Sequence, residues 1–153
     1  MYPPSHFLFA FLIAEIFVKF GMLSHEIAIL VALIAVLIDI DHFIYYAAKH
    51  RDLSLRNAWN AAVVKHEKGE RTFVHHFWGF LIVTLFLIGM WFVNLTTFFV
   101  IGISYYSHML LDDGFFVGKT VDIKEEGFVI KYPLYEFIFD VVIVAGIVGL
   151  FLF

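Results

Sequence analysis

The chain has 153 residues, of which 62% are hydrophobic, 20 are Phe and none is Cys. This apolar share exceeds the roughly 45–50% of soluble domains, so the sequence predicts an integral membrane protein with a single domain, residues 1–153. The net charge of −4 argues against a nucleic-acid partner, because binding to phosphates needs a basic surface. Without Cys, disulfides and Cys-ligated zinc are excluded.

Five apolar stretches are predicted to cross the membrane as α-helices, at about residues 6–22, 25–47, 74–93, 95–112 and 134–153. With their flanks they reach the roughly 17–25 residues that a spanning helix needs. No basic segment precedes the first stretch, so we expect it to be retained and not cleaved as a signal peptide. The predicted fold class is therefore an all-α bundle of about five transmembrane helices.

Two longer connections join these helices. In residues 48–73, one helical face carries Leu55, Trp59, Ala62 and Val63, which predicts an amphipathic helix lying in the membrane interface. In residues 113–133, β-prone runs flank a Glu-Glu-Gly turn, which predicts a small β-hairpin.

Basic residues are distributed unevenly across the predicted topology. Five spans place the N-terminus and both long connections on one side, and that side carries every Lys and Arg except Lys19. By the positive-inside rule this side faces the cytoplasm, and the C-terminus lies on the outer side of the cell membrane.

Histidine and aspartate residues from four predicted helices gather at the same cytoplasmic end. The spacing of Asp39 and His42 (i, i+3) and of His108 and Asp112 (i, i+4) places each pair on one helix face. Imidazole and carboxylate ligands without thiolates suit Zn²⁺ best, with Mn²⁺ or Fe²⁺ as alternatives. The predicted metal ligands are His6, Asp39, Asp41, His42, His75 or His76, His108 and Asp112.

The number of ions stays open at this point. On an ideal helix Asp41 points about 200° away from Asp39. Both can therefore bind one centre only if the helix loosens there, or two metal ions are present.

Further charged residues have alternative roles. Arg71 precedes His75 by four residues and is interpreted either as a clamp for an anionic oxygen or as a membrane anchor. Glu136, with Asp140 one turn later, is predicted to complete the site, act as general base or orient a ligating His. Glu15 is predicted to form an ion pair with Lys19.

These motifs, in this order, resemble the YdjM/YbcI-like family of membrane-bound metal-dependent hydrolases over about residues 5–114. The matching segments are His6, then "IDIDHF" with Asp39, Asp41 and His42, "RTFVHHF" with Arg71 and His75, and "SHMLLDD" with His108 and Asp112. Ile38 stands where the family pattern has Pro, and the Gly and Thr of its Arg-Gly-x-Thr-His segment are missing here. The resemblance implies a hydrolase that depends on a divalent metal.

Together these features predict an enzyme that binds one or two divalent ions at the cytoplasmic face and hydrolyses a lipid or lipid-linked phosphoester. Asp41, Asp112 or Glu136 would accept a proton, and Arg71 would stabilise negative charge. The alternative is a non-enzymatic metal-binding protein or a metal-ion transporter. Transporter sites usually lie near the bilayer midplane, whereas these ligands gather at one end.

Overall fold

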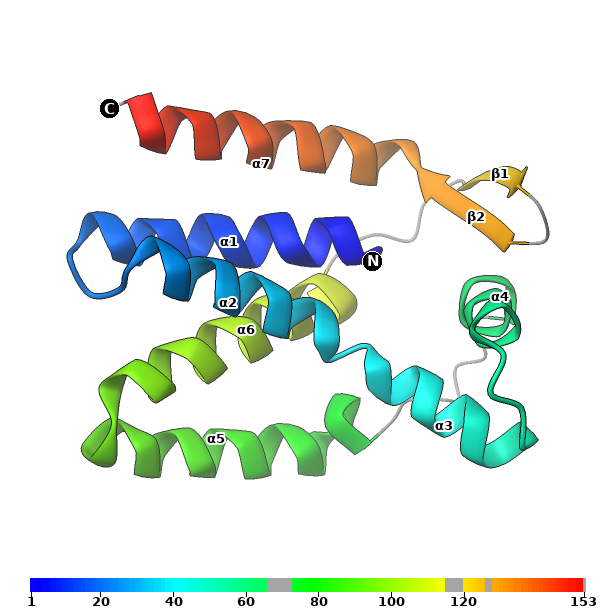
Figure 1. Ribbon diagram of the computed structural model, residues 1–153, viewed down its shortest axis with the longest axis horizontal. Coiled ribbons are helices and arrows are strands. Elements are labelled where there is room, and N and C mark those ends of the chain that lie inside the picture. Colours follow the sequence, from blue (N-terminus) through cyan, green and yellow to red (C-terminus); the bar gives the residue numbers. More distant parts are fainter. Residues whose placement is uncertain (66–72, 115–119, 126–127, 153) are drawn as a thin grey trace.

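The computed structural model describes residues 1–65, 73–114, 120–125 and 128–152. Helices α1 (Pro3–Lys19) and α2 (His25–Leu37) form a hairpin of two neighbouring helices (Figure 1). The turn between them contains Gly21 in the left-handed region, with φ at 71°. Ser24 then caps α2 by accepting a hydrogen bond from the backbone N–H of Ile27.

Small residues form the contact between α1 and α2. Ala10 and Ala14 of α1, and Ala28, Ala32 and Ala35 of α2, are completely buried. Because alanine side chains are short, the two backbones approach closely, as is common between helices in membranes. The core extends from this contact to Ile103 of α6 (Leu95–Gly114).

The helix predicted at 25–47 is interrupted. After α2 the chain turns at Ile38 and Asp39, and α3 (Ile40–His50) leaves the bundle at an angle (Figure 1). Three backbone hydrogen bonds here span only three residues each, from the N–H groups of Asp39, Asp41 and His42. This local tightening of the helix rotates the side chains that follow.

Beyond α3, helix α4 and a pair of β-strands lie at the same end of the bundle as the N-terminus (Figure 1). The predicted interfacial helix corresponds to α4 (Leu55–Lys65), and the ring of Trp59 lies 5.7 Å from that of Tyr2. Strands β1 (Thr120–Glu125) and β2 (Phe128–Pro133) pair in antiparallel register, and the turn predicted between them lies outside the described residues.

The remaining helices complete the bundle. A short 3₁₀ helix η1 (Phe73–His75) precedes α5 (Phe77–Val93), and His76 between them is extended, so the helix predicted at 74–93 is divided too. The last helix, α7 (Leu134–Leu152), lies beside α1 (Figure 1). By comparison with the prediction at 6–22, α1 begins and ends three residues earlier.

Two helices of the described chain are long and apolar enough to cross a membrane: the stretch His25–His50 and α7. Helix α5 is apolar but shorter. Large apolar side chains such as Leu33, Leu85 and Val142 point outward on these helices and are about half exposed. The membrane character is therefore supported, and the topology of five spans stays a prediction.

Candidate metal centre

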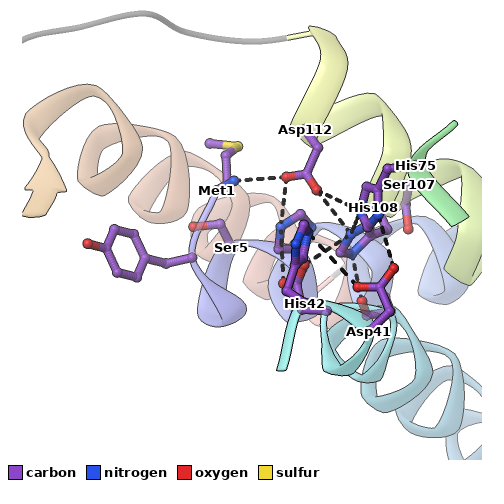
Figure 2. Close-up of polar contacts among 12 residues, drawn as sticks. Met1, Ser5, Asp41, His42, His75, Ser107, His108 and Asp112 are labelled. Carbon is purple, nitrogen blue, oxygen red and sulfur yellow. Dashed lines mark hydrogen bonds and ion pairs between the residues drawn. The ribbon is translucent and has the colours of Figure 1, made fainter. Parts of the chain in front are cut away.

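Four elements bring their polar side chains together at the end of the bundle where α2 is interrupted (Figure 2). His6 comes from the first turn of α1, and Asp39 from the junction of α2 and α3. His75 comes from η1, and His108 and Asp112 come from the end of α6. His6, His75 and His108 are each at most 8% exposed.

The first group of ligand atoms comprises His6, Asp39, His108 and Asp112, whose atoms lie within 4.8 Å of one another. Nε2 of His108 lies 3.4 Å from Asp39 Oδ1 and 3.1 Å from Asp112 Oδ2. Nε2 of His6 lies 3.2 Å from Asp112 Oδ1. Asp112 also accepts a hydrogen bond from the amino group of Met1 at 2.9 Å. The carboxylate of Asp112 is thus the hub of the group.

The second group comprises Asp39, His42 and His75 and shares Asp39 with the first. Asp39 and His42 belong to it together, as their i, i+3 spacing predicts. The interruption of the helix lets Asp39 belong to both groups, whereas Asp41 belongs to neither, and the number of ions stays a prediction. The arrangement has the donors for two ions with Asp39 between them.

Distances among these atoms match those around a bound metal ion. A tetrahedral zinc with ligands at about 2.0–2.1 Å has neighbouring ligand atoms about 3.3 Å apart. The contacts of His108 Nε2 with His75 Nε2, Asp112 and Asp39 are 3.1, 3.1 and 3.4 Å. Both ring nitrogens of His6 are buried without a hydrogen bond among the described residues. A divalent ion would supply a partner to such an atom, so the donor set fits a metal.

His108 and His75 are oriented by partners outside the ligand groups. Nδ1 of His108 lies 2.8 Å from the carbonyl oxygen of Ala35, and because a carbonyl only accepts, this nitrogen carries the hydrogen. Nε2 of His108 is therefore the atom available to a metal. Nδ1 of His75 lies 3.3 Å from the carboxylate of Asp41. Such carboxylate–histidine pairs typically orient metal ligands and make them more basic.

The surroundings of His75 change its protonation. Burial lowers the pKa of His75, but the carboxylates of Asp112 and Asp41 outweigh that effect and raise the pKa from 6.5 to about 9. Without a metal, the ring is therefore an imidazolium at neutral pH. A cation at this position is what the surrounding carboxylates favour.

Other predicted residues lie elsewhere. His76 is exposed and belongs to neither group, whereas its neighbour His75 is buried in the centre. Asp41 lies behind His75 and also belongs to neither group of ligand atoms. Glu136 is buried against α1, and Arg71 lies outside the described residues.

The ion pair predicted between Glu15 and Lys19 is wrong. The carboxylate of Glu15 is buried and contacts Nδ1 of His25 at 2.9 Å, whereas Lys19 is exposed. The turn at Gly21 brings the start of α2 back to the end of α1, so a residue distant in sequence displaces the local partner.

Two residues of the site carry no signal in the sequence. Ala35 contributes only a backbone carbonyl, and Ser5 is one of many hydroxyl residues in the chain. Only the packing of α2 and α7 against their neighbours reveals these roles.

Comparison with known proteins places the chain in its family. The model of a family described as YdjM inner membrane protein matches residues 1–118. No curated protein and no solved structure matches the chain. The matched region includes every ligand of both groups.

Proposed function

Since the chain belongs to the YdjM inner membrane protein family, we propose that it is a membrane-embedded hydrolase that binds one or two divalent metal ions. The observation that carries this proposal is the convergence of His6, His75 and His108 on the carboxylate of Asp112, at distances close to those between the ligands of a bound metal. Zn²⁺ is the first choice for such a set, and Mn²⁺ or Fe²⁺ are the alternatives.

The residues have three proposed roles: metal ligand, proton acceptor and clamp for an anionic oxygen. His6, Asp39, His108 and Asp112 would hold one ion, and Asp39, His42 and His75 a second. A bound divalent ion would polarise a phosphoryl or carbonyl oxygen and lower the pKa of a coordinated water to about 7. Asp41 is the best-placed proton acceptor, because its carboxylate lies beside His75 but outside both ligand groups. Arg71 keeps its predicted role as the clamp for an anionic oxygen.

The position of the centre supports a substrate from the membrane. The side chain of His42 is 37% exposed, whereas that of His108 is fully buried, so the centre is accessible from the side of α3. Helix α3 and the start of α5 also carry exposed apolar residues, among them Ile44 and Phe77. We therefore propose a lipid or lipid-linked phosphoester as substrate, bound at the cytoplasmic face.

Hydrolysis of lipids in detergent micelles tests this function. The metal-loaded protein should release headgroup or phosphate from a phosphoester lipid, and a chelator should abolish the release. Asp39→Ala should be inactive, while Asp52→Ala should be as active as the wild type, because Asp52 accepts hydrogen bonds from Ser54 and Asn57 and belongs to neither ligand group. Turnover of neither phosphoester nor carboxyl-ester lipids, or turnover unaffected by chelator, would overturn the proposal.

Metal transport is the second candidate, and the arrangement of ligands favours it less. Both ligand groups lie where α1 begins and where α2 and α6 end, whereas transporter sites usually lie near the bilayer midplane. Metal uptake into vesicles that contain the purified protein, without any lipid turnover, would support transport instead.

A further inference from the structure

Glu136 of α7 is one of the most deeply buried charged residues of the described chain, with 2% exposure. Its contacts are with α1 and not with the metal centre. The backbone N–H of Tyr2 donates to Glu136 Oε1 at 2.6 Å, and the hydroxyl of Ser5 donates to the same oxygen at 2.7 Å. The carboxylate of Glu136 thus links Tyr2, which precedes α1, and Ser5, in the first turn of α1, to helix α7.

His6 lies in that turn, directly after Ser5. Its ring is 1% exposed and stacks on His108, with centroids 4.1 Å apart. His108 has its own orienting hydrogen bond, from Nδ1 to the carbonyl of Ala35. Neither ring nitrogen of His6 has a hydrogen bond among the described residues. Apart from this stacking and the 3.2 Å contact of Nε2 with Asp112, the placement of the His6 ring depends on the backbone that carries it.

Two features restrict the movement of the backbone that carries His6. Pro3 and Pro4 occupy the first positions of α1, where their fixed φ angles restrict the turn. Hydrogen bonds to a charged group are also stronger than neutral ones. A carboxylate that accepts two donors from one helical turn resists its fraying.

Asp140, one turn further along α7, offers a matched comparison. Ser5 has one hydroxyl hydrogen and lies closer to Glu136, at 2.7 Å, than to Asp140, at 3.2 Å. Asp140 accepts a hydrogen bond from Tyr132. Replacing Asp140 thus leaves both bonds between Glu136 and α1 in place.

We propose that Glu136 is a positioning residue of the metal centre. Through Tyr2 and Ser5 it fixes the first turn of α1, and it thereby holds Nε2 of His6 toward Asp112. The effect on metal binding rests on the proposed function, whereas the anchoring of His6 does not.

The first test needs no metal. Hydrogen exchange of the amides of Tyr2, Ser5 and His6, and acylation of His6 by a histidine-selective reagent, are measured by mass spectrometry on the full chain in detergent; Pro3 and Pro4 have no amide hydrogen. Glu136→Ala should raise both rates at least about tenfold, the loss expected for one charged hydrogen bond. Glu136→Gln keeps an acceptor oxygen and should restore protection, and Asp140→Asn should behave like the wild type. Protection of His6 unchanged in Glu136→Ala would overturn the proposal.

The second test measures Zn²⁺ affinity by competition with a chelator, and the visible absorption of bound Co²⁺. Glu136→Ala should bind Zn²⁺ about 10–100-fold more weakly, with an altered Co²⁺ spectrum, and Glu136→Gln should recover both. Equal affinity and an equal spectrum in Glu136→Ala would contradict a role in positioning the ligand. A wild type that binds neither ion would overturn the proposed function, and the first test would still decide how His6 is anchored.

Should Glu136→Ala fail to fold, Ser5→Ala provides the same comparison with a smaller change. It removes one donor and leaves the bond from Tyr2 to Glu136. Faster exchange at residues 2–6 in Ser5→Ala would support the proposal, and exchange at the wild-type rate would contradict it.

Discussion

His75 and His108 face each other through their Nε2 atoms, which lie 3.1 Å apart in the buried interior. Nδ1 of His108 lies 2.8 Å from the carbonyl oxygen of Ala35, and the Nε2 atoms of both rings lie within 3.3 Å of Asp112 Oδ2. Nδ1 of His75 faces the carboxylate of Asp41. Because the pKa of His75 is raised to about 9, its positive charge in the metal-free protein lies where a metal ion would bind.

Metal binding is therefore expected to release the proton of His75. Its pKa of about 9 means that a metal competes with a proton at neutral pH. From pH 7 to 9 the apparent affinity should rise about tenfold per pH unit, as expected for one displaced proton. Titration calorimetry in buffers of different ionisation enthalpy would detect the released proton. An affinity that is constant from pH 7 to 9 would contradict this assignment.

The same proton should stabilise the metal-free fold. The pKa of His75 is raised from 6.5 in the unfolded chain to about 9 in the folded protein, so its contribution is complete below pH 6.5 and is lost as the pH rises through 9. Thermal unfolding of chelator-treated protein should occur at a lower temperature at pH 9.5 than at pH 6. A midpoint that rises over this range would argue that His75 is neutral.

Asp41→Asn tests the role of the carboxylate beside His75. The amide keeps the size of the side chain but removes the charge that raises the pKa of His75. Metal affinity should fall about 10–100-fold, and the pH dependence should move to lower pH. Loss of one of two bound ions would instead assign Asp41 as a ligand, and wild-type behaviour would exclude both roles.

Gly79→Ala tests how η1 is held against α5. A Cβ atom at this position would overlap the carbonyl oxygen of Phe73, so the 3₁₀ helix must move and displace His75. The variant should bind metal more weakly than the wild type. Gly89→Ala, in the same helix with nothing within 4 Å of the added atom, should leave affinity unchanged and stabilise the helix by about 0.5–1 kcal/mol. Equal metal affinities of the two variants would show that η1 adjusts without moving His75.

The membrane character and the residues of the centre are predicted from the sequence alone, because the apolar composition indicates the first and the spacing of His and Asp residues indicates the second. Apolar runs mark the helices, and the pairs Asp39/His42 and His108/Asp112 each share a helix face. The family match over residues 1–118 agrees with the resemblance carried by those motifs.

Other features of the site depend on tertiary contacts, which the sequence alone does not reveal. Only the extended backbone at His76 determines that His75 is buried and His76 exposed. The interruption at Asp39 depends on packing at the end of α2, where no Pro or Gly marks it. The sequence leaves Glu136 as a ligand, a general base or a residue that orients a His, because its partners Tyr2 and Ser5 lie more than 130 residues away in the chain.

The metal content of the protein purified without chelator tests the central claim most directly. Elemental analysis should find one or two equivalents of a divalent transition metal, with zinc expected first, in the wild type. His25→Ala should retain this metal, because His25 lies beside Glu15 and outside the centre, whereas His108→Ala should lose it. A wild type without stoichiometric metal, or a His108→Ala variant that keeps its full complement, would contradict the assignment of these residues as a metal centre.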